Sequence, residues 1–251
     1  MTQADKITRF RALHRPGDPL VLVNVWDVGS ANAVAEAGAP ALATASWACA
    51  ASRGFKDDQS LPLDEALINA RRIVEAVELA VSLDFESGYA SDHDGVAENV
   101  QRASQTGIAG VNLEDRLPGA DQPLALDQAV ARVRAARAAA PIFINARLDV
   151  FLANDKDRHE DLLDQAIARA RAFVDAGADG VFVPGLSDRG MLARVCAACP
   201  APVNAMAYDP VADRAMLAEA GVARISSGPG PYRAVMAALT ERAQGVYASD
   251  R

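Results

Sequence analysis

Three kinds of feature are scarce in this chain of 251 residues, and each scarcity excludes a class of protein. Three cysteines are too few for a disulfide framework, so we expect a protein of the reducing cytoplasm. No apolar run approaches the roughly 20 residues of a membrane span, so no membrane partner is expected. The formal net charge is −8, whereas binding to nucleic acid needs a basic face. The sequence therefore predicts a cytoplasmic protein with neither a membrane nor a nucleic-acid partner.

The few cysteines and histidines give no sign of a metal or redox centre. Cys196 and Cys199 have the C-x-x-C spacing of zinc and redox sites, but no second ligand pair accompanies them. Their segment is typical of a helix end before Pro200, so we predict that both cysteines have a packing role. None of the three histidines follows a predicted strand, so we expect all of them on the surface: His14, His93 and His159.

Apolar residues are abundant, at 51% of the chain, and they recur as short runs that alternate with helical segments. Strands are predicted at residues 20–25, 39–45, 79–83, 109–113, 142–146, 180–183, 202–205 and 223–226. Helices are predicted at residues 30–37, 63–77, 92–106, 126–139, 158–176, 187–198, 210–220 and 232–243. Short strands that are apolar throughout indicate a parallel sheet covered on both faces.

This alternation predicts an α/β fold, a single-domain (β/α)8 TIM barrel over residues 1–251. A glycine ends the helix and precedes the next strand four times, at Gly38, Gly107, Gly177 and Gly221. Such repetition favours similar units that close into a barrel. A doubly wound open sheet is the alternative. It is disfavoured because residues 24–27 read Asn-Val-Trp-Asp, where that fold would carry Gly-x-Gly-x-x-Gly.

Polar residues gather at the carboxyl ends of the predicted strands, where barrels place their active sites. The predicted ring contains Asn24, Asp27, Ser46, Asp84, Glu86, Glu114, Asp115, Arg116, Arg147, Asp149, Asn204, Ser226 and Ser227. The opposite strand ends are mostly Ala, Pro, Gly and Leu. This asymmetry is the strongest functional signal in the chain.

Carboxylates follow two successive strands of this ring, Asp84 and Glu86 after one and Glu114 and Asp115 after the next. Carboxylates are costly to bury unless they are paired or bound to metal. Several that converge form a natural site for a hard cation such as Mg²⁺. Asp84 and Glu86 lie two apart on an extended segment, so both should face the barrel axis. Asp115 should point the opposite way and form a salt bridge with a helix. The alternative is that Asp84 and Glu86 pair with nearby arginines as a structural network.

Three segments at these positions resemble the isocitrate lyase/phosphoenolpyruvate mutase superfamily. Residues 84–89, Asp-Phe-Glu-Ser-Gly-Tyr, resemble its metal-site strand end, usually Asp-x-Asp-x-Gly-Tyr. Residues 107–115 resemble its Ala-Gly-x-x-Gly-x-x-x-Glu-Asp segment, and residues 145–149 resemble its Ala-Arg-x-Asp segment. The three occur in order and at barrel spacing, and the similarity extends over the whole chain.

The resemblance implies a Mg²⁺-dependent enzyme, with Mn²⁺ as a substitute, that breaks a C–C bond in a small 2-oxo or 2-hydroxy carboxylate through a metal-stabilised enolate. Asp84 would bind the metal directly, and Glu86 and Glu114 would hold it largely through waters. Arg147 would bind a carboxylate or polarise an oxygen. The implied catalytic residues are Arg147, Glu114 and Asp58, the last on a gating loop.

The same resemblance implies a site for the carboxylate of the substrate at Ser46, with the backbone of Trp47 and Ala48. Trp26 would form a wall of the pocket, and Asp27 and Asp149 would brace its loops. The implied substrate-binding residues are Trp26, Asp27, Ser46, Trp47, Ala48, Arg147 and Asn204.

The sequence also departs from the family pattern. Glu86 stands where most members have the shorter Asp. The isocitrate and methylisocitrate lyases carry a Lys-Lys/Arg-Cys-Gly-His loop after the Glu-Asp pair, but residues 116–124 contain no Cys and no His. We therefore expect a lyase or an oxaloacetate-decarboxylase-like enzyme for a smaller acid. The alternatives are P–C chemistry of the phosphoenolpyruvate mutase or phosphonopyruvate hydrolase type, and a non-catalytic barrel that binds a small acid.

The resemblance finally implies a homo-oligomer, a dimer or a tetramer, in which the last helix packs against a neighbouring subunit. The predicted helix at residues 232–243 carries apolar residues at Val235, Met236, Ala238 and Leu239. It follows a Gly-Pro-Gly segment that could let it exchange between subunits. An ordinary barrel would fold the same apolar face back on its own strands, so the pattern alone does not decide.

Overall fold

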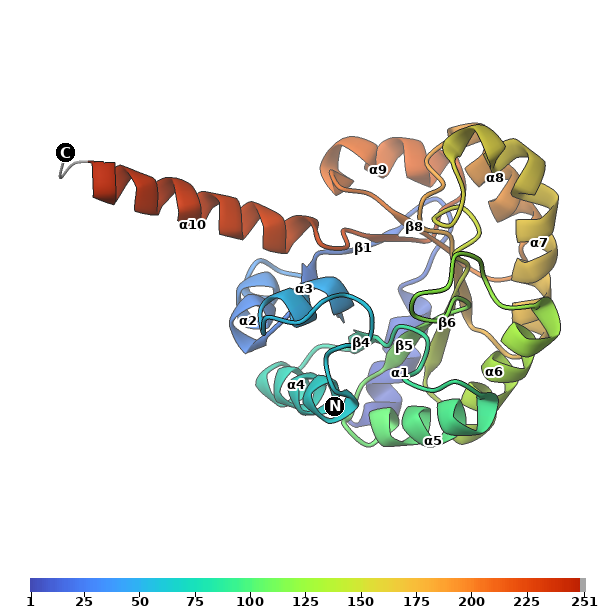
Figure 1. The fold of residues 1–251 in the computed structure, drawn as a ribbon, viewed down its shortest axis with the longest axis horizontal. Coiled ribbons are helices and arrows are strands. Elements are labelled where there is room, and N and C mark those ends of the chain that lie inside the picture. The colour runs from blue at the N-terminus through green and yellow to red at the C-terminus, as the bar shows by residue number, and fades with distance from the viewer. Residues whose placement is uncertain (249–251) are drawn as a thin grey trace.

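The computed structural model describes residues 1–248, and the last three residues of the predicted domain, 249–251, lie outside the described part. Its strands form one parallel sheet that curves into a barrel, with helices outside it (Figure 1). The strands are β1 (Leu20–Leu22), β2 (Asn24–Val25), β3 (Leu42–Thr44), β4 (Val81–Asp84), β5 (Gly110–Glu114), β6 (Phe143–Arg147), β7 (Gly180–Phe182), β8 (Val203–Met206) and β9 (Arg224–Ser226). The predicted α/β barrel is confirmed.

The first strand closes the barrel, because its two halves bond to different neighbours. β1 pairs with β9, with Leu20 opposite Arg224, whereas β2 pairs with β3, with Asn24 opposite Ala43. The strand order is therefore β1-β9-β8-β7-β6-β5-β4-β3-β2. Only Val23 separates β1 from β2, so the nine segments act as eight strands. The strand predicted at residues 20–25 is correctly placed but interrupted.

All eight predicted helices are present, and the structure adds two that the sequence analysis missed, α1 and α3. The helices are α1 (Gln3–Ala12), α2 (Val28–Glu36), α3 (Ser46–Ala51), α4 (Leu63–Ala76), α5 (His93–Ser104), α6 (Leu126–Ala139), α7 (His159–Asp175), α8 (Arg189–Ala198), α9 (Pro210–Glu219) and α10 (Gly230–Ala248), with a 3-10 turn η1 (Lys156–Arg158). α1 is mostly polar, but its Phe10 is fully buried. The Phe10 ring packs edge-on against Phe143 at the amino end of β6.

The prediction that all three histidines lie on the surface is wrong for two of them. His14 is buried, stacks on Phe143 at 4.4 Å between ring centroids, and places Nδ1 2.8 Å from the carbonyl of Phe10. Burial lowers the pKa of His14 to about 3. His159 is also buried, with Nε2 3.0 Å from the carbonyl of Phe151. Each imidazole has a carbonyl partner and an aromatic neighbour in the core, whereas Nε2 of His14 has no hydrogen-bond partner among residues 1–248.

The C-x-x-C pair behaves as an ordinary helix end, as predicted. α8 ends at Ala198, and Cys199 is its capping residue. Both Cys196 and Cys199 are free thiols and half-buried. Burial raises the pKa of Cys196 to about 12, so this thiol stays protonated and unreactive near neutral pH.

The last helix does not fold back on its own barrel. α10 projects away from the strands (Figure 1), and none of its described residues is buried. Its first turn meets the barrel, where Tyr232 lies edge-on to Trp26 at 5.1 Å. Further along, Val235 and Leu239 are exposed. Within residues 1–248, no helix combines the length and the apolarity that a membrane crossing requires.

Candidate active site

The carboxyl ends of β4, β5 and β6 bring the predicted charged residues to one edge of the barrel. The strands are parallel and in register, so Asp84 lies opposite Asn112, and Glu114 lies opposite Arg147. The backbone N–H of Glu114 donates to the carbonyl of Glu86 at 2.9 Å, which ties the first loop to the second strand. The sheet register therefore brings these carboxylates together, as the sequence analysis predicted.

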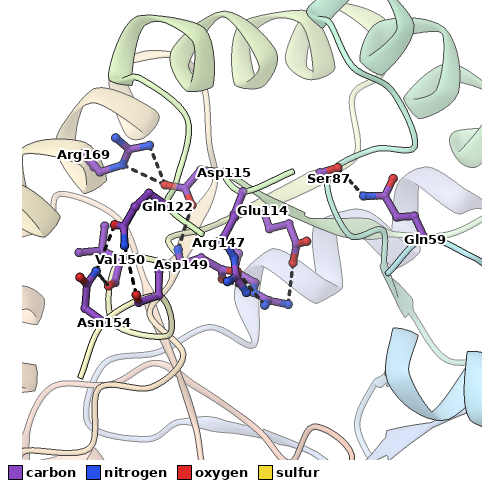
Figure 2. A network of polar contacts seen from close by, with 12 residues as sticks. Gln59, Ser87, Glu114, Asp115, Gln122, Arg147, Asp149, Val150, Asn154 and Arg169 are labelled. Atoms are coloured by element: carbon purple, nitrogen blue, oxygen red, sulfur yellow. Dashed lines mark hydrogen bonds and ion pairs between the residues drawn. The ribbon is translucent and has the colours of Figure 1, made fainter. Parts of the chain in front are cut away.

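Arg147 lies between two carboxylates and uses all three of its nitrogens (Figure 2). Its Nη1 is 2.8 Å from Oε2 of Glu114. Its Nε and Nη2 are 2.7 and 3.1 Å from the two oxygens of Asp149. Burial raises the pKa of Glu114, and the Arg147 guanidinium opposes this rise. Asp149, which is fully buried, also accepts from Nε of Arg116 at 3.0 Å, so it holds both arginines in position.

Asp84 is held more loosely and only by neutral groups. The backbone N–H of Ser46 donates to its Oδ2 at 2.9 Å, and the Asn112 amide approaches its Oδ1 at 3.5 Å. Within residues 1–248, Asp84 forms no ion pair with a basic side chain. Its oxygens thus keep free lone pairs, which is what a direct metal ligand requires.

Glu86 is buried on a strained loop beside Asp84. Its backbone is left-handed, with φ at +48°, a conformation that costs a non-glycine residue about 1–3 kcal/mol and is concentrated at functional sites. Burial, followed by the charges of Asp84 and Asp57, raises the pKa of Glu86 to about 7. Hydrogen bonds from the Tyr89 hydroxyl and the Gln59 backbone, each at 3.0 Å, oppose the rise.

These oxygens fit a hard divalent cation. Asp84, Glu86 and Glu114 supply carboxylate oxygens, and burial is the main cause of the raised pKa values of the two glutamates, with the charges of nearby carboxylates adding to it. In the described part of the chain, however, no three His, Cys, Asp or Glu residues stand close enough to hold an ion together. Mg²⁺ matches this arrangement, because it is commonly held by one or two carboxylates and completes its shell with waters.

A cavity of about 310 Å³ opens beside the cluster. It is lined by Ser46, Asp57, Asp58, Glu86, Glu114, Arg116, Leu117, Pro118, Gly119, Ala120, Asp121 and Arg147. Larger hollows, of about 680 and 580 Å³, lie between α5 and α6 and beside the carboxyl end of α8. We place the site in the smaller cavity, because it alone among these three adjoins the strand-end carboxylates.

Five residues with a predicted binding or catalytic role line this cavity, together with Arg116 of the predicted ring and others that the prediction left out. The predicted five are Ser46, Asp58, Glu86, Glu114 and Arg147. Asp58 is exposed and hydrogen-bonds the Ser60 hydroxyl. Its neighbour Asp57 is also exposed, but it interacts with the cluster, since partial burial and the charge of Asp84 raise its pKa while a hydrogen bond with the Ser46 hydroxyl lowers it. No signal in the sequence separates two adjacent aspartates on one loop.

The remaining predicted residues, including the predicted metal ligand Asp84, lie around the cavity without lining it. Asp27 caps α2 by accepting from the backbone N–H of Ser30 at 2.7 Å. Asn204 lies inside the barrel, with its amide 3.2 Å from the Ser226 hydroxyl. Trp26 meets Tyr232, and so does Trp47 at 5.8 Å. Trp47 and Ala48 belong to the first turn of α3, which has no side-chain cap and leaves backbone donors at that end.

The prediction for Asp115 is confirmed. Its carboxylate turns away from the cavity and pairs with Arg169 of α7, both side chains being buried, with 2.9 Å between Nη2 and Oδ2 (Figure 2). Its other oxygen accepts from the backbone N–H of Asp149 at 2.9 Å. The pair therefore ties the loop after β5 to the loop after β6 and to the outer helix layer.

Comparison with known proteins finds relatives that cover most of the chain. An uncharacterised protein of Mycobacterium tuberculosis (strain ATCC 25618 / H37Rv) is 36% identical over 238 residues, which covers 94% of this chain and 88% of that protein. An oxaloacetate decarboxylase of Bradyrhizobium sp. (strain ORS 278) is 32% identical over 196 residues, which covers 74% of this chain and 65% of that protein. A solved structure of a candidate phosphonomutase from Burkholderia cenocepacia J2315 matches with a TM-score of 0.92 at 46% identity, covering 97% of this chain and 99% of that one.

The family model described as phosphoenolpyruvate phosphomutase matches residues 10–247, nearly the whole described chain. The match includes all three segments that carried the resemblance in the sequence, at residues 84–89, 107–115 and 145–149. The chain therefore belongs to the phosphoenolpyruvate phosphomutase family, within the isocitrate lyase/phosphoenolpyruvate mutase superfamily.

Proposed function

We propose that the protein is a Mg²⁺-dependent enzyme that breaks a C–C bond in a small 2-oxo or 2-hydroxy carboxylate through a metal-stabilised enolate. One observation carries the proposal: Glu86, Glu114 and Arg147 line a small polar cavity at the carboxyl ends of the barrel strands, and Asp84 ends the strand next to that of Glu114. Family membership supports the same chemistry.

Each residue has a role that follows from its contacts. Asp84 would bind Mg²⁺ directly, with Glu86 and Glu114 holding its waters. The metal would act as a Lewis acid on the substrate oxygen. Ser46, together with the first-turn N–H groups of Trp47 and Ala48, would hold the substrate carboxylate.

The residues at the mouth would complete the reaction. Arg147 would direct its remaining N–H donors at the reacting oxygen, because Glu114 and Asp149 fix its plane. The loop that carries Asp57 and Asp58 would close over the cavity and limit the access of water. Trp26 and Trp47 would shield one side, with Tyr232 between them. Asp27 and Asn204 would support the site from α2 and from the barrel interior.

The short loop after β5 argues for a small substrate. Residues 116–124 lack the cysteine and histidine of the isocitrate lyase loop, so we propose that isocitrate and methylisocitrate are not substrates. A lyase or an oxaloacetate-decarboxylase-like reaction needs fewer loop groups. The Bradyrhizobium oxaloacetate decarboxylase, at 32% identity, supports this choice. P–C chemistry is the second candidate, favoured by the match to the phosphoenolpyruvate phosphomutase family and by the phosphonomutase-like structure.

A substrate panel tests the proposal. The protein should release pyruvate or CO₂ from at least one 2-oxo or 2-hydroxy acid when Mg²⁺ is present, and chelation with EDTA should stop the reaction. Consumption of phosphonopyruvate instead would favour the second candidate. Tight binding of an acid such as oxalate, with no turnover of any panel member, would identify a non-catalytic barrel. Efficient formation of glyoxylate from isocitrate would contradict the loop argument.

We also propose that the protein acts in the cytoplasm as a homo-oligomer, a dimer or a tetramer, in which α10 packs against a second copy. The helix buries no described residue on its own barrel, and it presents Val235 and Leu239 to solvent. Removing residues 229–251 should shift the assembly toward monomer or unfold the chain. Light scattering that reports a stable full-length monomer at micromolar concentration would rule out the exchanged helix.

A further inference from the structure

Two arginines line the cavity, and they differ in how many of their donors are already used. Arg147 has each of its three nitrogens in an ion pair with Glu114 or Asp149. Arg116 uses Nε alone, which lies 3.0 Å from Asp149. Within residues 1–248, neither Nη atom of Arg116 has a hydrogen-bond or ion-pair partner. A guanidinium has five N–H donors, so four of those on Arg116 remain open.

The position of Arg116 is fixed although its donors are free. Its predecessor Asp115 is locked to Arg169, and the backbone N–H of Leu124 donates to the carbonyl of Asp115 at 2.8 Å. Arg169 also donates to the carbonyl of Leu124 at 2.8 Å, so both ends of the short loop are anchored. The contact of Nε with Asp149 then fixes the base of the guanidinium. The open fork is therefore preorganised, which lowers the entropy cost of binding a ligand.

The ligand that fits this fork is a carboxylate. Arginine binds carboxylates with two parallel hydrogen bonds. The Arg116 side chain is 30% exposed, against 17% for Arg147, so it lies nearer the mouth of the cavity. Resting on the proposed function, which places one acid group of the substrate at the metal end, we propose that Arg116 binds the second acid group of a dicarboxylate. We further propose that it favours reactions in which that group is retained.

The charge changes of the two candidate reactions explain this preference. In a decarboxylation, the bond to the second carboxyl group breaks, its electron pair passes into the enolate, and the group leaves as neutral CO₂. An arginine bound to that group stabilises the substrate more than the transition state, so it slows the reaction. The same contact therefore opposes loss of CO₂ from a 2-oxo diacid.

Cleavage of a 2-hydroxy diacid between C2 and C3 moves charge the other way. The hydroxyl proton passes to a carboxylate of the site, C2 becomes a carbonyl, and the electrons of the C2–C3 bond flow toward the second carboxylate. That group becomes transiently dianionic until C3 takes a proton from water, which yields a 2-oxo acid and a monocarboxylic acid. Arg116 stabilises this transition state more than the substrate. No oxidant or reductant is needed.

A binding experiment with Arg116→Gln tests the first half of the proposal. Malate and lactate share a 2-hydroxy acid and differ in the second carboxylate, and oxalate reports on the metal end alone. By calorimetry with Mg²⁺, the wild type should bind malate about 10- to 100-fold more tightly than lactate, as one charge-assisted pair predicts. Arg116→Gln should bring this ratio close to one and leave oxalate binding unchanged. Arg116→Lys should keep part of it, and Arg134→Gln, an exposed arginine on α6, should keep all of it.

Turnover tests the second half, because the two reactions should respond in opposite directions. Arg116→Gln should lower kcat/KM for 2-hydroxy diacids by at least about 10-fold and leave decarboxylation of oxaloacetate unchanged or faster. An equal loss in both reactions, or a wild type without preference for malate over lactate, would overturn the inference.

If the wild type binds oxalate with Mg²⁺ but shows no such preference, the inference about Arg116 fails and the proposed function stands. If it binds neither Mg²⁺ nor oxalate, the proposed function fails with it.

Discussion

The two sides of the site hold their carboxylates in different ways. On the β4 side, Asp84 and Glu86 meet neutral donors, such as the Ser46 N–H and the Tyr89 hydroxyl. On the β5–β6 side, Glu114, Asp115 and Asp149 each meet an arginine (Figure 2). The carboxylates on the β4 side therefore have no basic partner in the described part of the chain and are available to a cation. Those on the β5–β6 side are paired with arginines, and these ion pairs fix the positions of side chains and loops. Under the proposed function, the β4 side would supply the direct metal ligand, and the β5–β6 side would mainly fix the position of Arg147.

The sharpest test of this division is the loss of Asp84. Asp84→Ala should reduce Mg²⁺-dependent turnover below detection, because it removes the least engaged oxygen ligand. The fold should survive, since Asp84 forms no ion pair within residues 1–248, and the melting temperature should move by only a few degrees. Wild-type turnover in this variant, or a Mn²⁺ soak with no metal near Asp84, would contradict the assignment.

The β5–β6 side should show the reverse behaviour, a loss of stability. Asp115→Asn leaves the buried guanidinium of Arg169 without its counter-ion, which should cost about 3 kcal/mol in the free energy of unfolding. Urea denaturation measures this loss. Asp64→Asn, which breaks an exposed pair with Arg102, is the matched control and should cost less than about 1 kcal/mol. Similar losses in the two variants would mean that the buried pair does not organise these loops.

The pH dependence should come from the β4 side. Burial raises the pKa of Glu86 to about 7, so below this pH the metal must displace a proton. Mg²⁺ affinity should fall about tenfold for each pH unit below 7.

The stability of the metal-free protein should also depend on pH. In the unfolded chain Glu86 has its ordinary pKa of 4.5, and in the folded chain its pKa is about 7. Between these two pH values, Glu86 is therefore protonated in the folded chain and ionised in the unfolded chain. Stability should therefore decrease as the pH rises through that window. Both slopes should flatten in Glu86→Gln; an unaltered slope would exclude Glu86 as the titrating group.

A smaller change should come from Tyr89→Phe. The Tyr89 hydroxyl donates to Oε1 of Glu86 at 3.0 Å and opposes the rise in the pKa of that carboxyl. Its removal should move the midpoint of the Mg²⁺ affinity profile upward by up to about one pH unit, the size of one hydrogen bond. Calorimetric titrations at several pH values would detect the shift. A midpoint that stays in place would show that the Tyr89 hydroxyl does not influence the pKa of Glu86.

Strand and helix positions could be predicted because each apolar run and each terminal glycine is a local signal. The helix over residues 126–139 was predicted with its observed bounds. Local signals fail where a partner far along the chain decides the outcome. His14 is accommodated by Phe143, α1 contributes a single buried ring to a mostly polar segment, and the exposed face of α10 has no partner on its own barrel.

The site could be predicted as a set of strand ends but not as a set of contacts. Asp84, Glu86 and Glu114 were identified because their positions relative to the strands put them at one edge. The choice of Asp57 as the aspartate nearer the cluster depends on the path of a loop, which spacing does not define. Among the described residues, the two Nη atoms of Arg116 are open because Asp149 contacts only its Nε. Sequence spacing does not show which donors of a side chain are used, so this feature could not be predicted.

The divided first strand has a consequence for the order of folding. Leu20 must pair with Arg224, more than 200 residues later in the chain, before the barrel is closed. At synthesis rates of about 5–20 residues per second, that partner leaves the ribosome on the order of 10–40 s after β1 does. During this time β2 can pair with β3, but β1 presents an open edge. Closure should therefore be a late and slow step, dominated by distant contacts. A newly made chain would be most prone to aggregate through β1, and this is the edge on which we expect chaperones to act.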